Sequence, residues 1–235
     1  MQRGFSFGSQ DFTVAGDAAL YWPTHRALLV ADLHLEKASA FATSGQMLPP
    51  YDSRATLEEL AALACQFEAA KIICLGDNFH DDDGEHRLGG DAGSILTQLT
   101  TQYDWLWITG NHDRGLAAKW GGTTVLEHAL SGILLRHEAG PHENQPEMSG
   151  HFHPKYRQQL RGRMVSRRCF VRTANKLIMP AFGAFTGGMD AGDPAIVGKH
   201  VALEGVDYEV IGVMPREFEF REPGTDVWTP LPFVP

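Results

Sequence analysis

The sequence of 235 residues is poor in several features, and each absence excludes a class of protein. No apolar run approaches the roughly 20 residues that a membrane-spanning helix needs. The N-terminal stretch MQRGFSFGSQDF has no apolar segment of the kind found in secretory signals. The three cysteines, Cys65, Cys74 and Cys169, are odd in number and widely spaced, which argues against a disulfide framework. We therefore expect a globular protein without a membrane span, with reduced cysteines, in the cytoplasm.

Motifs for a covalent nucleophile are also absent. The sequence has no G-x-S-x-G and no C-x5-R motif, so no motif indicates a serine or cysteine nucleophile. Internal repeats and low-complexity tracts are missing as well. A length of 235 residues and an apolar fraction of 43% suit one ordinary globular domain with a substantial core.

Acidic residues are missing from one long stretch, although the net charge of the chain is −9. The total charge argues against a broadly basic surface for nucleic acid. Residues 148–189, however, contain no Asp or Glu and hold eight basic side chains, among them Arg167 and Arg168. One interpretation is a track for a phosphate backbone, with Arg167 and Arg168 binding substrate. The other is a set of solvated side chains balanced by acids elsewhere in the fold.

Five short polar clusters each follow an apolar run that reads as a buried strand. Ligands at the ends of several strands can converge on one point. The clusters offer two Asp, one Asn and four His besides His112, a donor set that suits a pair of divalent cations. In chain order they are Asp32-Leu33-His34, Gly76-Asp77, Gly110-Asn111-His112-Asp113, His137 and Gly150-His151-Phe152-His153.

Spacing within the clusters has a physical rationale. Residues i and i+2 of a strand share a face, so Asp32 and His34 can reach the same ion. A carboxylate such as Asp77 can bridge two cations and offset their repulsion, and ions about 3.5–4 Å apart can clamp a phosphate. The glycines of the clusters allow sharp turns or close approach of the backbone.

The pattern D-x-H, G-D, G-N-H-D, H, G-H-x-H resembles the calcineurin-like metallophosphoesterases. The stretches LLVADLHLEKASAFA, GQMLPPYDSRATLEELA, ICLGDNFHD, WITGNHD, LLRHEA, SGHFHP and MPAFGAFTGG are similar to one branch, the ligase-associated DNA damage response metallophosphoesterases. The resemblance covers roughly residues 15–192. It implies a four-layer α/β/β/α sandwich of two mixed β-sheets; periodicity by itself allows other mixed α/β folds.

The resemblance also implies roles for individual residues. One ion is expected at Asp32, His34, Asp77 and His153, and a second at Asn111, His137 and His151 with Asp77 shared. His112 is the expected general acid. Asp113 is expected to orient His112 or raise its pKa, or else to be a solvated turn carboxylate. His80 or Asp81 can orient a ligand histidine. The ions are expected to be Mn²⁺, with Fe, Zn²⁺ or Mg²⁺ as alternatives.

The activity implied is hydrolysis of phosphodiesters by metal-activated water, in a DNA endonuclease of DNA repair that acts beside a DNA ligase and a helicase. The acidic total charge equally suits a small phosphodiester or a nucleotide as substrate. A different class of function is a metal-stabilised scaffold without catalysis, against which the intact Asn111-His112 pair counts. Oligomeric state is left open.

Turn residues and periodicity predict the elements along the chain. Two strands are expected in residues 12–35, a loop at 36–50, a helix capped by Asp52 or Ser53 and running to about residue 70, and a strand at 71–75. An acidic loop at 81–85, a helix at 91–103, a strand at 104–109 and two strands within 123–137 follow. Strands near 147–152, 164–172 and 176–181 are expected to complete a second sheet.

The C-terminal tail, residues 193–235, departs from the phosphoesterase pattern, so we divide the chain into a domain at 1–192 and this tail. It is similar to part of the periplasmic core domain of macrolide-exporter-type ABC permeases. Val201–Leu203 and Tyr208–Val213 are expected to form a hairpin. The tail is either a fusion or sequence artefact joined near Asp193-Pro194, which we favour, or a divergent hairpin that extends the sandwich. The segment has no transmembrane helix.

Overall fold

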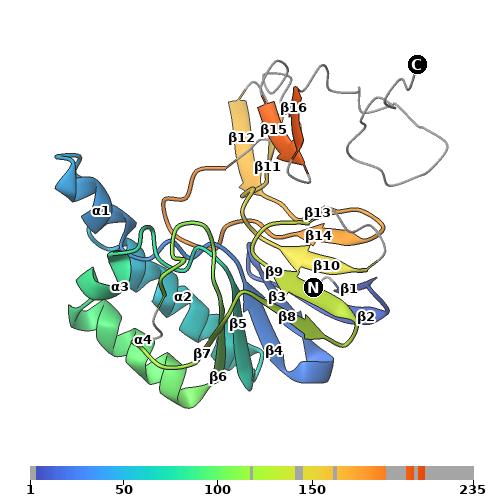
Figure 1. Cartoon of the computed structure of the whole chain (residues 1–235), viewed down its shortest axis with the longest axis horizontal. Coiled ribbons are helices and arrows are strands. Elements are labelled where there is room, and N and C mark those ends of the chain that lie inside the picture. Colours follow the sequence, from blue (N-terminus) through green and yellow to red (C-terminus); the bar gives the residue numbers. More distant parts are fainter. Residues whose placement is uncertain are drawn as a thin grey trace.

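The computed structural model describes residues 4–116, 119–140, 145–160, 163–188, 200–203 and 206–209 (Figure 1). The proposed boundary at residue 193 and most of the tail lie outside these residues. Within the described part, no helix combines the length and the apolar character that a membrane crossing requires.

The larger sheet has seven strands in the order of the sequence. Its first half is an antiparallel meander and its second half is parallel, and helices carry the chain back in two of the three parallel connections. The N-terminal region therefore contributes two more strands than the two predicted. The strands are β1 (Gly4–Phe7), β2 (Gln10–Ala15), β3 (Ala19–Trp22), β4 (Ala27–Val30), β5 (Lys71–Leu75), β6 (Asp104–Ile108) and β7 (Thr123–Val125).

Helices α2 (Asp52–Gln66) and α4 (Gly90–Gln102) confirm the two predicted helices. Leu57 and Leu60 of α2 and Leu96 of α4 are fully buried with Val30 and Ile72 of the sheet in one hydrophobic cluster. The alternate strand residues belong to a second cluster on the opposite face. This alternation is the expected one for a strand with both faces buried.

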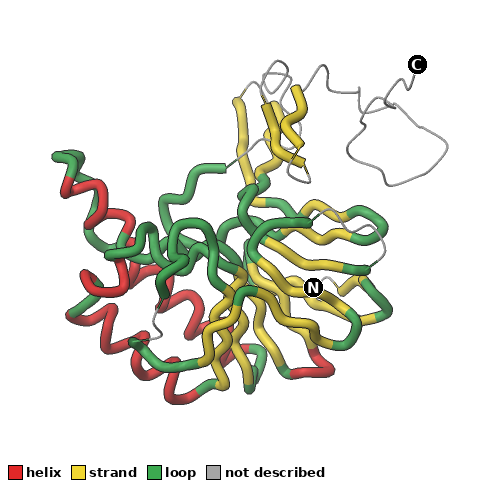
Figure 2. Tube along the Cα trace, viewed as in Figure 1, coloured by secondary structure: helices red, strands yellow, loops and turns green. Residues whose placement is uncertain are grey.

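The second sheet closes that opposite face. Its order is β13 (Val171–Arg172), β14 (Lys176–Ile178), β10 (Glu147–Ser149), β9 (Ile133–Arg136) and β8 (Glu127–Leu130). Leu135 and Met148 pack against Leu29, Ile73 and Ile108 of the larger sheet. Two mixed sheets with helices outside confirm the expected α/β class (Figure 2). Within the described residues the α-helices all come from residues 37–102 and lie over the larger sheet, so this part of the chain shows three of the four expected layers.

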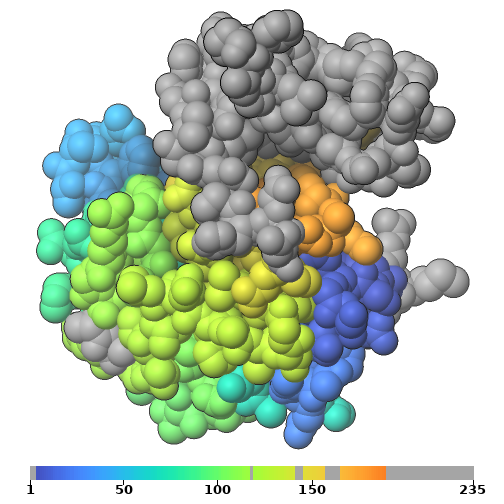
Figure 3. Space-filling model, turned by 45° about the vertical axis from the view of Figure 1, so that its right-hand side comes forward, coloured from blue at the N-terminus to red at the C-terminus, as the bar shows by residue number. Residues whose placement is uncertain are grey.

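The two sheets also meet at their edges. On the face seen in Figure 3, the N-terminal strands (blue) lie beside the residues of β13 (orange). There the Arg172 guanidinium lies 5.9 Å from the centre of the Phe5 ring. The contact joins the first strand of one sheet to the edge strand of the other.

A separate two-stranded ribbon interrupts the second sheet in sequence. Strands β11 (Lys155–Leu160) and β12 (Arg163–Arg168) pair only with each other among the described strands, and they project from the body (Figure 1). The prediction that 164–172 completes the second sheet is therefore wrong for β12 and right for β13. Pairing with β11 over six residues gives β12 its ladder of backbone hydrogen bonds outside the sandwich.

The tail hairpin is confirmed, with β15 (His200–Leu203) paired to β16 (Val206–Glu209). Leu203 faces Val206, so the second strand starts two residues earlier than predicted. The later residues of the predicted strand, up to Val213, lie outside the described part.

The segment predicted as a loop at 36–50 contains a short helix, α1 (Lys37–Thr43). The predicted caps of α2 explain the difference. The carboxylate of Asp52 accepts the Ala38 N–H at 2.9 Å, and the Ser53 hydroxyl accepts the Glu36 N–H at 2.7 Å. These side chains thus hold the start of α1, and α2 begins without a side-chain cap.

Candidate metal centre

The polar clusters of the sequence gather at one edge of the sandwich. Strands β4, β5 and β6 are parallel, so their carboxyl ends meet there, and Asp32, Asp77 and Asn111 follow those ends. His151 follows β10 of the other sheet, and the His151 N–H lies 3.0 Å from the Asp32 carboxylate. Both sheets therefore contribute to one centre.

Five of the predicted ligands have a left-handed backbone. Their φ angles are +52° at Asp32, +45° at His34, +46° at Asp77, +70° at His151 and +47° at His153. Such angles are uncommon outside glycine and persist where the surroundings enforce them. The i, i+2 pairs do reach one centre, but the rationale from strand alternation is wrong. β4 ends at Val30 and β10 at Ser149, so turns beyond the strands aim these side chains.

One set of potential metal ligands consists of Asp32, His34, Asp77 and His153. The Nε2 atoms of His34 and His153 are 3.3 Å apart. His153 Nε2 lies 3.5 Å from Asp32 Oδ1, and His34 Nε2 lies 3.8 Å from Asp77 Oδ2. Both carboxylates are buried, at 0% and 2% exposed, so an uncompensated pair of negative charges here would be costly.

The second set consists of Asp77, His137 and His151, with Asn111 beside them. Asn111 Oδ1 lies 2.9 Å from His137 Nε2 and 3.1 Å from His151 Nδ1, and these two nitrogens are 3.0 Å apart. Atoms at right angles around an ion about 2.1 Å away are themselves about 3 Å apart. The three atoms therefore fit one shared cation.

Asp77 belongs to both sets. Its Oδ2 lies toward His34, and its Oδ1 lies 3.4 Å from His137 Nε2. A bridging carboxylate is the arrangement that two neighbouring cations require. The donor chemistry and the packing of this structure thus fit two divalent ions.

Glycines make room for the carboxylates. A methyl group on Gly110 would overlap the carboxylate of Asp77, and one on Gly150 would overlap that of Asp32. Both glycines therefore leave space for a buried carboxylate, and their close approach to the ions stays a prediction.

Burial favours the neutral form of two of these histidines, His34 and His151. Burial, together with the neighbouring His153 and His112, lowers the pKa of His34 to about 2. Burial and His137 lower the pKa of His151. Metal ions bind the neutral imidazole, so a lowered pKa reduces the proton's competition with the metal.

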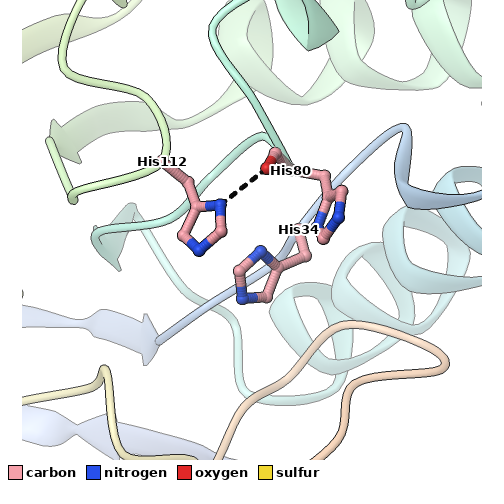
Figure 4. A group of neighbouring side chains, drawn as sticks. All are labelled: His34, His80 and His112. Carbon is pink, nitrogen blue, oxygen red and sulfur yellow. Dashed lines mark hydrogen bonds between the residues drawn. The ribbon is translucent and has the colours of Figure 1, made fainter. Parts of the chain in front are cut away.

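His112 stands at the open side of the centre, with 41% of its side chain exposed. Its backbone N–H donates to Asp77 Oδ1 at 3.0 Å, and its Nε2 lies 3.9 Å from Asp77 Oδ2. Its Nδ1 lies 2.8 Å from the carbonyl oxygen of His80 (Figure 4). A carbonyl only accepts, so the Nδ1 proton stays there and Nε2 faces the centre.

The ring of His80 joins His34 and His112 in a third cluster of possible metal ligands (Figure 4). Its centroid lies 5.4 Å from that of His34 and 5.5 Å from that of His112. Asp81, the alternative to His80 in the sequence, lies 2.7 Å from Arg87 Nη2 in an ion pair and so anchors α3 (Gly84–Arg87). His80 is therefore the one of the two that lies against the ring of a predicted ligand.

Sequence reasoning missed Lys37 beside this cluster. Burial lowers the pKa of Lys37, and its charge contributes to the lowered pKa of His34 and of His80, after burial in both cases. The position of Lys37 in the stretch LHLEK, three residues after His34, could have indicated this proximity.

Asp113 has a different task from the two considered in the sequence. It is 2% exposed, so it is not a solvated turn residue. Its carboxylate accepts the Asn78 N–H at 2.7 Å, the Asn78 side-chain amide at 2.8 Å and the Gly110 N–H at 2.7 Å. Burial raises its pKa, and these hydrogen bonds oppose that shift. Asp113 ties the loop after β5 to the loop after β6, while the His80 carbonyl orients His112.

The predicted substrate-binding arginines lie on the β11–β12 hairpin, outside these clusters. Arg168 Nη2 donates to the Gly183 carbonyl at 2.8 Å. Arg167 is exposed and donates to the adjacent Ser166 carbonyl.

A two-sheet α/β sandwich with Asp, Asn and His converging at its carboxyl edge is the arrangement of a metal-dependent phosphoesterase. The family described as "Calcineurin-like phosphoesterase" matches residues 25–228, and the chain belongs to this family. It is thus a hydrolase of phosphoric esters, with His/Asp clusters typical of binuclear members.

Solved structures give two further comparisons. The chain is similar to the Pseudomonas putida nuclease MPE, with 29% identity and a TM-score of 0.65 over 81% of this chain and 90% of that one. It is also matched to YfcE, a phosphoesterase from E. coli, with 14% identity and a TM-score of 0.40 over 69% of this chain and 83% of that one. Comparison with curated proteins gives no match.

Replacing Asp113 by alanine should lower both stability and metal affinity. The substitution leaves buried N–H groups of Asn78 and Gly110 without an acceptor, at a cost of about 1–3 kcal/mol for each buried group. It also frees the loops that carry Asp77 and Asn111. Thermal melting and Mn²⁺ titration measure the two effects, with Asp17→Ala in the exposed β2–β3 turn as control. A variant that melts and binds Mn²⁺ like the control would contradict this role.

Proposed function

We propose that this hydrolase uses two divalent cations, with Mn²⁺ the expected species, to cleave phosphodiesters in DNA. One observation carries the proposal: the carboxylate of Asp77 lies between two converging sets of ligand atoms. The first set is assigned to Asp32, His34 and His153, and the second to Asn111, His137 and His151. Bound there, two ions would clamp the phosphate oxygens and activate water.

His112 is proposed as the general acid. Its Nδ1 proton is held by the His80 carbonyl, so the second proton of the imidazolium is carried by Nε2, which faces the centre. From there it can protonate the leaving oxygen. The exposed position of His112 leaves space for a substrate in front of it.

DNA as the substrate is supported by the similarity to a nuclease and by the acid-free basic stretch that begins at the centre. A small phosphodiester or nucleotide is the second candidate, favoured by the net charge of −9. Cleavage of single- and double-stranded DNA should be compared with cleavage of bis-p-nitrophenyl phosphate, p-nitrophenyl phosphate and cyclic nucleotides. Turnover of a small ester with intact DNA would favour the second candidate.

The roles in DNA repair beside a ligase and a helicase stay predictions. The same substrate screen tests the alternative of a scaffold without catalysis. A scaffold would bind metal but hydrolyse none of the esters. The tail at 193–235 is proposed to be separable from this activity, since every assigned ligand precedes residue 154.

The Asp77→Ala variant should lose binuclear binding, because two cations would lie close together without their shared anion. Elemental analysis after dialysis is expected to find two Mn²⁺ per wild-type chain and at most one in the variant. Asp91→Ala, at an exposed position on α4, is the control. Two tightly bound ions in Asp77→Ala would overturn the bridging role.

The His112→Ala variant should retain both ions but lose roughly 10²–10⁴-fold in turnover of a substrate with a poor leaving group. The loss should be smaller with p-nitrophenolate, which departs without much protonation. Equal losses on both kinds of substrate would remove His112 from acid catalysis.

Arg167→Glu should weaken DNA binding and reduce the salt dependence of log Kd by about one unit for a lost phosphate contact. Arg168 is unsuited to this test because its guanidinium also holds the Gly183 carbonyl. Arg54→Glu, at an exposed position on α2 and outside this stretch, is the charge-matched control. An unchanged salt slope in Arg167→Glu would show that the hairpin does not follow the DNA backbone.

A further inference from the structure

Phe185 combines two unfavourable features. Its φ is +57°, a region that bulky residues rarely occupy, and its side chain is 53% exposed. A large apolar residue in a strained backbone usually gains compensation from burial, which is incomplete here. An observed outlier of this kind supports a hypothesis of function.

The backbone around Phe185 is fixed to the metal centre. The Phe182 N–H donates to the Ala31 carbonyl at 2.8 Å, and the Gly183 N–H donates to the Asp32 carbonyl at 3.1 Å. A methyl group on Gly188 would overlap the carbonyl of His153. The loop 183–188 therefore begins against Asp32 and ends against His153, two assigned ligands of the same ion.

Side chains brace the same loop. The Ala184 N–H donates to the Thr56 hydroxyl at 3.0 Å, and Lys155 Nζ donates to the Thr186 carbonyl at 2.9 Å. Two residues span at most about 7 Å, so the Phe185 backbone stays within that distance of Gly183. Phe185 is thus displayed from a firmly held loop beside the centre.

Tyr156 is a second exposed aromatic close to the ligands. It lies three residues after His153 on β11, and its side chain is 39% exposed. It is directly opposite Arg167 in the hairpin register, so the two side chains share a face of the ribbon. The neighbouring pair, Lys155 and Arg168, faces the other way and holds the loop 183–188.

The stretch of sequence that holds both aromatics suits a polyanion. Phe185 and Tyr156 both belong to the stretch 148–189, which contains eight Lys or Arg and no acid. Aromatic faces interleaved with basic groups are the usual platform for unpaired bases on a phosphate chain. An apolar protein partner would gain nothing from this charge.

We propose that Phe185 stacks on an unpaired nucleobase beside the scissile phosphodiester, and that Tyr156, on the other face of the β11–β12 ribbon, stacks on a base farther along the same strand. The proposal rests on the proposed function, because it assumes nucleic acid as the substrate. It adds the two aromatic residues that would position the strand through contact with unpaired bases.

The test compares Phe185→Ala, Tyr156→Ala and Phe185→Leu with wild type on a single-stranded oligonucleotide and on bis-p-nitrophenyl phosphate. Loss of one stacked base should raise KM for the oligonucleotide about 5- to 150-fold. Hydrolysis of the small diester should change less than twofold. Phe185→Leu should resemble Phe185→Ala, and Phe185→Tyr should resemble wild type, because the π face is what matters. Leu126→Ala, at a position that is 79% exposed, is the control for loss of a surface apolar group.

Two further readouts separate stacking from a structural role. Abasic sites on both sides of the cut should raise KM for wild type and leave KM for Phe185→Ala closer to its value on the intact oligonucleotide. Phe185→Gly, which suits φ +57°, should melt at the wild-type temperature or higher while binding the oligonucleotide more weakly. A large fall in its melting temperature, or equal loss of activity on both substrates, would overturn the proposal.

The outcomes also distinguish this proposal from the one on which it rests. If wild type hydrolyses the small diester but cleaves no oligonucleotide, nucleic acid is not the substrate and both proposals fail. If wild type cleaves the oligonucleotide and the aromatic variants do so with unchanged KM, only the stacking proposal fails.

Discussion

The shared position of the Asp77 carboxylate is the constraint around which the centre is arranged. β5 delivers the residue to the edge of the larger sheet, and the His112 N–H and the absent side chain of Gly110 fix the space around its oxygens. Histidines, and no lysine or arginine, accompany them in the two ligand sets, so the buried carboxylates of Asp32 and Asp77 have no permanently charged cationic partner there. Divalent cations bound there would supply the missing charge, and the proposed phosphoester chemistry follows from that requirement.

The packed strands of the sandwich stabilise the strained backbone of the ligand residues. Five assigned ligands have positive φ angles, and such conformations persist only when their surroundings enforce them. The strands before them are almost completely buried between two hydrophobic clusters. Asp113 adds a polar link between two of the loops. Rigid strands thus hold strained turns at their carboxyl ends, where flexible loops would let the ligands relax and the two sets separate.

The sequence predicted the elements whose signal is local. The strands at β5 and β6, the helices α2 and α4, and the convergence of Asp32, Asp77, Asn111 and the histidines all followed from apolar runs and the residues after them. Contacts between distant segments were not predictable in this way. Asp52 and Ser53 resemble helix caps in sequence, yet they bind the start of α1, and Asp113 resembles a turn residue, yet it is buried under Asn78. The prediction that β12 belongs to the second sheet failed because a strand can pair with its sequence neighbour or with a larger sheet. The pattern of apolar and polar residues is the same in both cases.

The most direct test of the central claim is the anomalous diffraction of crystals grown with Mn²⁺. The account predicts two peaks about 3.5–4 Å apart, with the Asp77 carboxylate between them, one beside His34 and His153 and the other beside His137 and His151. A single peak, or a peak enclosed by His34, His80 and His112 with Asp77 uncoordinated, would contradict it.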